Sequence, residues 1–200
     1  AKVHPGATLT PHFRDFLPPW VARQPWYAGP GTPTLSPVGY FRFEDPAGEV
    51  GIETHLVTDG PAVYQIPMTY RGAPLEAAQE GTLIAKAQHS VLGMRWIYDG
   101  VADPVWRAQL LSLIRTSGVS DPSSKRGVGP AEARGRLLAP EGFSDEAVRI
   151  DLERVLIPGP SAIGSGVAGL VIGTWHPDGG TAGTATGCLA TAWETTGASA

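Results

Sequence analysis

The segment GEVGIETHLVTDGPAVYQIPMTYRG, residues 48–72, carries the pattern that decides the fold. Apolar and polar residues alternate on both sides of Asp59-Gly60, which predicts two strands joined by a hairpin turn; Pro61 leaves the type of turn open. The same alternation occurs over residues 38–45, and two further strands are predicted over 82–93 and 94–100. Together these segments predict an antiparallel meander with one apolar face.

Two flanking segments show the three- and four-residue spacing of amphipathic helices. The first is predicted over residues 10–23 with Thr10 as its cap, although the proline pair at 18–19 should kink or end it. The second begins at Asp103-Pro104 and ends at Gly118. The apolar stripe of this second helix is most economically buried on the sheet.

The remainder of the chain predicts a linker and then more strands. The residues after Gly118 are rich in Ser, Gly and Pro, as linkers often are. Apolar runs then predict strands over 147–157, 168–176 and 188–194, and the HPDGG corner that starts at His176 predicts a hairpin. We expect a first domain over residues 1–116, a linker over 117–136 and a small antiparallel β subdomain over 137–198.

Composition and charge narrow the class of protein. The 26 glycines and 19 prolines favour strands, turns and loops over long helices. The net charge of -4 argues against nucleic acid or an anionic membrane as a partner, and no apolar stretch approaches the roughly 20 residues of a membrane span. The opening AKVHPGATLT lacks the apolar core of a secretory signal, and Cys188, being alone, forms no internal disulfide or thiolate metal cage. These features predict a cytoplasmic protein.

Aromatic side chains gather in PPWVARQPWYAGPG, residues 18–31. Large rings fill a small core well, so we assign Trp20, Trp96 and Trp106 to the core, with a platform that stacks on sugar rings as the alternative. Trp26 and Tyr27 border a glycine-proline loop. We predict that this pair forms a contact surface for a ligand or partner.

The stretch WVARQPWYAGPG, residues 20–31, resembles the W-L-x-x-Q-R-W-(Y/F)-A-G-K-G opening of the N-terminal cap of bacterial maltokinases, which phosphorylate maltose in trehalose and α-glucan metabolism. Pro25 and Pro30 replace the usual Arg and Lys of that pattern. YDGVADPVWRAQLLSLI, residues 98–114, resembles the closing pattern of the cap, and the stretches between them resemble free-standing cap-like proteins of about this length. The residues that match the opening pattern are Trp20, Gln24, Trp26, Tyr27, Ala28, Gly29 and Gly31.

The resemblance, which covers about residues 13–114, implies a fold and a function. The maltokinase cap is a curved antiparallel sheet with helix packed on it, and it holds none of the phosphotransfer residues. We therefore expect an α+β chain: a cap-like domain over residues 1–116, built as a curved antiparallel sheet with two short helices packed on it, plus the small C-terminal β-rich subdomain. The resemblance also implies a non-catalytic binding or regulatory module without a cofactor, with a protein partner from trehalose or α-glucan metabolism.

Each sequence motif that would indicate catalysis lacks a residue or a spacing that the chemistry requires. Residues 164–169 fit G-x-G-x-x-G, but residues 170–200 contain neither Lys nor Arg to bind a phosphate, so we interpret the match as chance. The five histidines lack the i, i+4 spacing of a zinc site, which predicts no metal. Glu53, a candidate acid for glycoside chemistry, falls on the outward phase of its strand, where a solvated side chain is expected.

One alternative function is left open: a small sugar-binding protein, or an enzyme acting on an α-glucan or a sugar phosphate, with its site at one edge of the sheet. Arg71, His89, Arg95 and Asp99 are the residues that could converge there. For His89 we favour the simpler interpretation of a partly buried side chain hydrogen-bonded to the backbone. An exposed strand edge could also pair two copies of the chain, which leaves a homodimer open.

Overall fold

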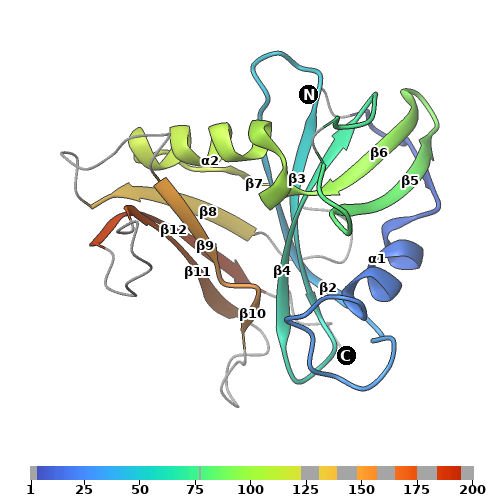
Figure 1. The fold of residues 1–200 in the computed structure, drawn as a ribbon, viewed down its shortest axis with the longest axis horizontal. Helices are drawn as coiled ribbons and strands as arrows, with labels where there is room; N and C mark the ends of the chain where they lie inside the picture. The colour runs from blue at the N-terminus through green and yellow to red at the C-terminus, as the bar shows by residue number, and fades with distance from the viewer. Residues whose placement is uncertain are drawn as a thin grey trace.

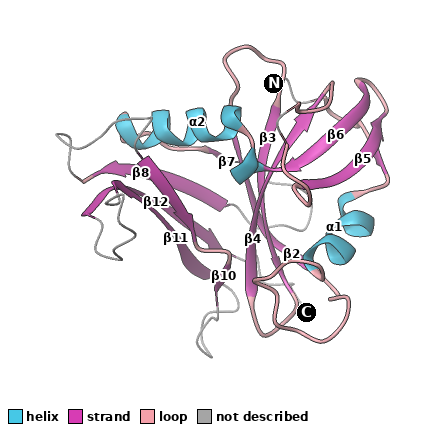
Figure 2. Cartoon of the chain, viewed as in Figure 1, coloured by secondary structure: helices cyan, strands magenta, loops and turns pink. Residues whose placement is uncertain are grey.

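Two antiparallel sheets organise the computed structural model, which describes residues 4–76, 78–122, 131–138, 148–156, 165–174 and 184–194. The larger sheet has the strand order β1-β5-β6-β4-β3-β2-β7, with β10 paired to β4 (Figures 1 and 2). Its strands are β1 (Leu9–Thr10), β2 (Ser36–Phe43), β3 (Gly51–Thr58), β4 (Val63–Arg71), β5 (Leu83–His89), β6 (Gly93–Asp99), β7 (Asp121–Pro122) and β10 (Val155–Leu156). The second sheet, in the order β8-β12-β11-β9, consists of β8 (Ala131–Leu137), β9 (Val148–Leu152), β11 (Ser165–Thr174) and β12 (Thr184–Glu194).

The strands predicted between residues 38 and 100 are confirmed, but their order is not a simple meander. β5 and β6 form a hairpin, and β6 rather than β5 pairs with β4. The chain after β4 therefore first forms β5, on the far side of β6, and then returns as β6, which lies between β5 and β4. The curved antiparallel sheet with two helices is confirmed.

The two helices begin at different kinds of cap. α1 (Phe13–Val21) starts later than predicted because His12, not Thr10, is its cap: the His12 Nδ1 accepts from the Arg14 N–H at 3.4 Å, and the Asp15 carboxylate accepts from the His12 N–H at 2.9 Å. α2 (Pro104–Arg115) starts as predicted, with the Asp103 carboxylate accepting from the Val105 N–H at 2.9 Å. Between β6 and α2 lies a short 3₁₀ turn, Gly100–Ala102.

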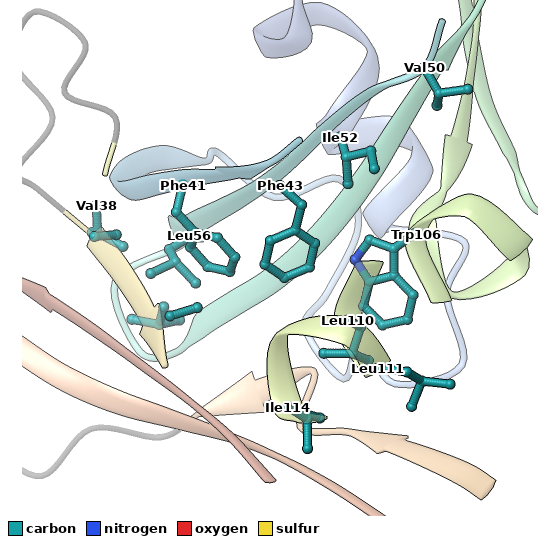
Figure 3. Close-up of a cluster of buried hydrophobic side chains, with 13 residues drawn as sticks. Val38, Phe41, Phe43, Val50, Ile52, Leu56, Trp106, Leu110, Leu111 and Ile114 are labelled. Carbon is teal, nitrogen blue, oxygen red and sulfur yellow. The ribbon is translucent and has the colours of Figure 1, made fainter. Parts of the chain in front are cut away.

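One face of strands β2, β3 and β4 packs against α2. Because successive side chains of a strand point to opposite faces, Phe41, Phe43, Ile52 and Leu56 share this face (Figure 3). They meet a stripe of α2 side chains that are at most 2% exposed: Trp106, Leu110, Leu111 and Ile114. We call this buried apolar cluster between the sheet and α2 the dry core.

The opposite face of the same strands packs against α1, which lies on the other side of β3 and β4 (Figure 1). Val57, Ile66 and Met68 contribute to it from the strands. The expectation of a single apolar face is therefore wrong, because the alternate residues are also covered. Phe16, Leu17, Trp20 and Val21 contribute from the helix. The core assignment holds for Trp20 and Trp106, which are 1% and 2% exposed, whereas Trp96 is half-buried with the Lys86 ammonium 6.0 Å from its ring.

Part of the stretch expected to be a linker is a strand. β8 packs Ala131 and Ala133 into the cluster that contains α2. A Cβ on Gly135 would lie 2.4 Å from the Leu113 carbonyl oxygen, so only glycine allows β8 to approach α2 this closely. Small residues alternating with charged ones look polar in composition but fit a tight interface. The domain boundaries stay predictions, and the HPDGG corner lies outside the described residues.

Candidate functional site: a polar pocket beside the first helix

A pocket of about 930 Å³ lies on the α1 face of the larger sheet, beyond the end of the apolar cluster. Its floor comes from alternate residues of neighbouring strands. Arg42 of β2 pairs directly with Glu53 of β3, and Tyr40 pairs with His55 in the same register. Tyr70 of β4 also lines the pocket. The strand periodicity thus gathers polar side chains at one end of a face that is apolar at the other.

Glu53 is the centre of a hydrogen-bond network on this floor. Its Oε1 accepts from the Tyr40 hydroxyl at 2.8 Å, and its Oε2 lies 3.2 Å from the His55 Nε2. The pKa of Tyr70 is raised well above its ordinary value by burial and then by the negative charge of Glu53. The Glu53 side chain is only 19% exposed, so the expectation of a solvated carboxylate is wrong.

The chain before α1 forms one wall of the pocket. His4, Thr8, His12 and Phe13 all line it. β1 holds this segment in place by pairing Leu9 with His89, and the Thr8 N–H and carbonyl also bond to Ser90 at 2.9 and 3.0 Å. We call this segment, residues 4–12, the strap. It covers the polar strand residues that α1 does not reach and so encloses the floor of the pocket.

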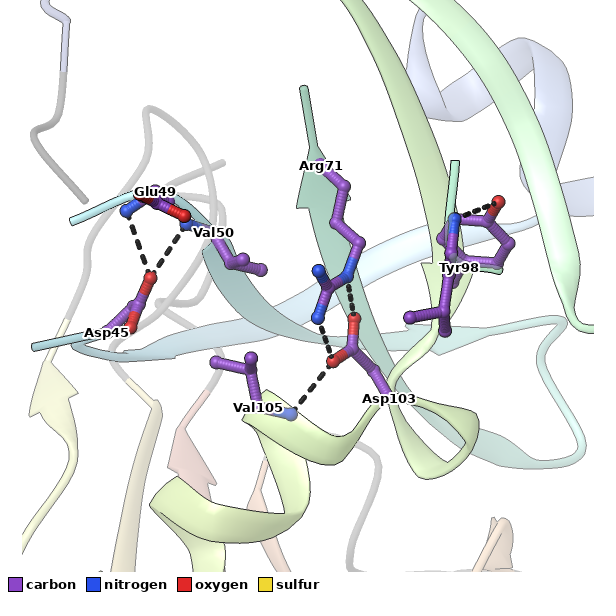
Figure 4. Close-up of polar contacts among 8 residues, drawn as sticks. Asp45, Glu49, Val50, Arg71, Tyr98, Asp103 and Val105 are labelled. Carbon is purple, nitrogen blue, oxygen red and sulfur yellow. Dashed lines mark hydrogen bonds and ion pairs between the residues drawn. The ribbon is translucent and has the colours of Figure 1, made fainter. Parts of the chain in front are cut away.

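A tight loop between β2 and β3 shapes the rim. The Asp45 carboxylate accepts from the backbone N–H groups of Glu49 and Val50 at 3.0 and 2.8 Å (Figure 4), and from that of Ala47 at 3.1 Å. Burial alone would raise the pKa of Asp45, but these three donors outweigh it and lower the pKa below its ordinary value. The loop therefore presents Gly48 and Glu49 to the pocket in a fixed position.

Arg71 lines the pocket, and its positive charge is neutralised by Asp103 at the start of α2. Its Nε and Nη2 donate to the two carboxylate oxygens of Asp103 at 2.6 and 2.7 Å, a bidentate pair (Figure 4). Asp103 is 1% exposed; burial favours a raised pKa, but the bonds from Arg71 and from the Val105 N–H lower it. One carboxylate thus ties the end of β4 to the start of α2.

His89 and Arg95 stand at the other side of the pocket, on the β5–β6 hairpin. The His89 Nδ1 accepts from the backbone N–H groups of Val91 and Leu92, both at 3.1 Å, which agrees with the expected backbone-bonded histidine. The Arg95 Nη2 donates to the Leu92 carbonyl at 2.5 Å. Three of the four residues of the alternative site, Arg71, His89 and Arg95, therefore line one pocket.

The other predicted site residues lie elsewhere. Asp99 does not line the pocket: its Oδ2 bonds to the Arg154 Nη2 at 2.5 Å. Trp26 and Tyr27 are half-buried beneath α1, with their ring centres 5.8 and 5.9 Å from that of Tyr64. The Arg154 guanidinium lies 5.8 Å from the Trp26 ring. These three residues contact the segment 148–156 or the core rather than the pocket.

Sequence reasoning did not select Tyr40, Arg42 or Tyr70, and it placed Glu53 in solvent. The usable signal was the spacing Y-x-R in residues 40–42 and E-x-H in residues 53–55. Charged and aromatic groups at alternate strand positions share a face. What the spacing did not reveal is that this face is covered by the strap before α1.

Neither a metal site nor a membrane-spanning helix occurs among the described residues. In the described ranges, no group of three or more His, Cys, Asp or Glu side chains is placed to hold a metal ion. No helix in that part of the chain is long and apolar enough to cross a membrane.

A comparison with protein families gives a match. The family model of the maltokinase N-terminal cap domain matches residues 20–103, which include the floor strands β2, β3 and β4 and the β5–β6 hairpin. The search of curated proteins finds no match. Residues 20–103 are therefore similar to a maltokinase N-terminal cap domain, and the strap that forms one wall of the pocket lies before the matched region.

Proposed function

We propose that this chain, which carries a maltokinase-cap-like domain, is a non-catalytic binding module that holds a small hydroxylated ligand in its polar pocket. The relation to α-glucan metabolism rests on the cap-domain match over residues 20–103. The pocket volume of about 930 Å³ falls in the range of small-molecule sites and would accept a mono- or disaccharide.

The observation that carries this proposal is the ordered carboxylate of Glu53 at the pocket floor. Tyr40 and His55 fix its two oxygens on one side, and its 19% exposed side chain still reaches the pocket. A carboxylate only accepts hydrogen bonds, so it suits the hydroxyl groups of a sugar. The rings of Tyr70 and Phe13, which also line the pocket and are half-buried, offer apolar surface to the faces of a pyranose ring.

A binding role fits the chain better than group transfer. The glycine-rich residues 164–169 are followed by no Lys or Arg up to residue 200, which leaves no cation after that loop to hold a nucleotide phosphate. Glu53 is engaged by neighbouring donors, as in a site that orients a ligand. Regulation of a separate enzyme of α-glucan or trehalose metabolism stays a prediction.

The test is a titration of the purified chain with maltose, trehalose, glucose and glucose 6-phosphate by calorimetry. A ligand at a hundred times its Kd should stabilise the fold by about 2.7 kcal/mol, which thermal unfolding would also report. Glu53→Gln should weaken binding by about tenfold or more, because it removes a charged acceptor. Glu80→Gln, at an exposed position outside the pocket, is the matched control. Absence of binding by every compound, or equal binding by Glu53→Gln, would contradict the proposal.

A further inference from the structure

The charges that line the pocket are not balanced in the same way at every point. Arg71 is paired with Asp103 through two bonds of 2.6 and 2.7 Å. Arg42 lies between carboxylates, 3.7 Å from Glu44 and 3.8 Å from Glu53. Both of these guanidinium groups therefore have an anionic neighbour in the protein.

Arg95 differs from the other two arginines. Within the described parts of the chain it has no carboxylate partner, and its buried Nε has no hydrogen-bond acceptor. Its position is nevertheless fixed, since Nη2 donates to the Leu92 carbonyl and a Cβ on Gly72 would come within 3.0 Å of Nη1. A guanidinium held at a pocket wall without a counter-charge is suited to a ligand anion.

His89 adds a donor beside Arg95. Because its Nδ1 accepts from two backbone N–H groups, the ring proton of the neutral histidine lies on Nε2, which is then a donor. The His4 ring centre lies 5.9 Å from that of His89. Burial, followed by the positive charges of His4 and Arg95, lowers the pKa of His89, which agrees with a positive local potential.

We propose that Arg95 and His89 form an anion subsite, so that the ligand is a small hydroxylated molecule with one phosphate or carboxylate group. The anionic group binds at the hairpin side, where Arg95 lacks a counter-charge. The hydroxyl groups point to Glu53, because like charges keep the anion away from that carboxylate and from Glu49 on the rim. This inference rests on the proposed function, since it assigns the charge of the ligand that the same pocket holds.

The test compares four titrants by calorimetry: glucose, glucose 6-phosphate, gluconate and inorganic phosphate. Glucose 6-phosphate or gluconate should bind at least about tenfold more tightly than glucose, as expected for a charge-assisted bond. Arg95→Gln should remove this preference, because it should weaken the binding of the anionic compounds by more than it changes the binding of glucose. Arg23→Gln, which changes an exposed arginine outside the pocket, is the matched control and should keep the preference. The stronger of the two anions identifies the source of the charge.

The outcomes separate this inference from the proposed function. Glucose bound as tightly as both of its anionic derivatives would overturn the anion subsite and leave the binding module in place. Binding of none of the four would overturn both. A readout without any variant is the salt dependence of the unmodified chain: added salt should weaken glucose 6-phosphate binding and spare glucose binding. Equal salt dependence for the two would overturn the subsite.

Discussion

The two faces of strands β2, β3 and β4 are built from alternate residues of the same segments, yet one is a dry core and the other holds a pocket. On the α2 face, Phe41, Ile52 and Leu56 meet a helix and β8, and each of these three side chains is at most 1% exposed. On the α1 face, Val57 and Ile66 lie under the helix, while Arg42 and Glu53 lie beyond its end.

The difference shows that the covering elements, rather than the strands, decide which end of a face forms a pocket. α1 is a helix of nine residues and covers only part of its face. Several of the residues that it leaves uncovered are polar and bond to one another, as the contacts of Glu53 with Tyr40 and His55 show. The longer α2, together with β8, covers more of the other face of the described strands.

The largest expected effect is a difference in the free energy of unfolding between a variant of the α2 face and a variant of the pocket face. Trp106→Ala removes a ring that is 2% exposed in the dry core, and it should lower the free energy of unfolding by about 3–5 kcal/mol. Tyr40→Phe on the pocket face deletes one hydroxyl and should cost about 1 kcal/mol. Chemical denaturation of both variants measures the contrast. Similar losses would mean that the pocket face is as essential to folding as the dry core.

An intermediate effect is expected at the ion pair that joins the faces. Asp103→Asn keeps an acceptor for the Val105 N–H but removes the charge that Arg71 faces. It should lower the free energy of unfolding at neutral pH by about 2–4 kcal/mol, less than a fully buried pair, because the Arg71 side chain is 20% exposed.

The same pair has a defined pH dependence. The pKa of Asp103 is lowered from its ordinary value of 3.8, so its stabilisation is present above that value and lost as the pH falls through the lowered pKa. Acid denaturation should therefore show a smaller pH-dependent loss in Asp103→Asn than in the unmodified chain. Asp121→Asn, at an exposed position, is the control. Identical acid profiles for all three proteins would exclude this role for Asp103.

The smallest effect concerns the hairpin side of the pocket. The pKa of His89 is lowered from its ordinary value of 6.5, so the unfolded chain binds the proton more readily, and stability falls as the pH drops below that value. His89→Asn should reduce this fall, measured by denaturation at about pH 7.5 and about pH 5.5. The other histidines are present in both proteins, so their contributions to the pH dependence cancel when the two are compared. An unchanged pH slope would show that His89 does not sense the charges of His4 and Arg95.

Much of the fold could be predicted because the decisive signals are local. Alternation along residues 48–72 predicted β3 and β4, and Asp103-Pro104 predicted the start of α2. β8 could not be predicted in this way, since its Ala131, Ala133 and Gly135 are chosen for a close approach to α2 that is not encoded nearby in the chain. The pairing of β6 with β4 is likewise a long-range choice.

The candidate site was predictable only in part. Arg71, His89 and Arg95 were named together because they flank one sheet edge, and they do line one pocket. Asp99 was placed with them by the same reasoning, but it pairs with Arg154, a residue 55 positions away in the chain. Glu53 was missed because its phase in β3 says which face it occupies and nothing about what covers that face.

By itself the sequence determined strands β2 to β6, the second helix and the side of the sheet on which the side chains of these strands lie, because backbone propensity and a period of two act between near neighbours. Tertiary structure alone decided that Glu53 is enclosed, that Arg71 is neutralised and that Arg95 is left without a carboxylate in the described chain. These outcomes depend on contacts between segments tens of residues apart, and no local pattern carries that information.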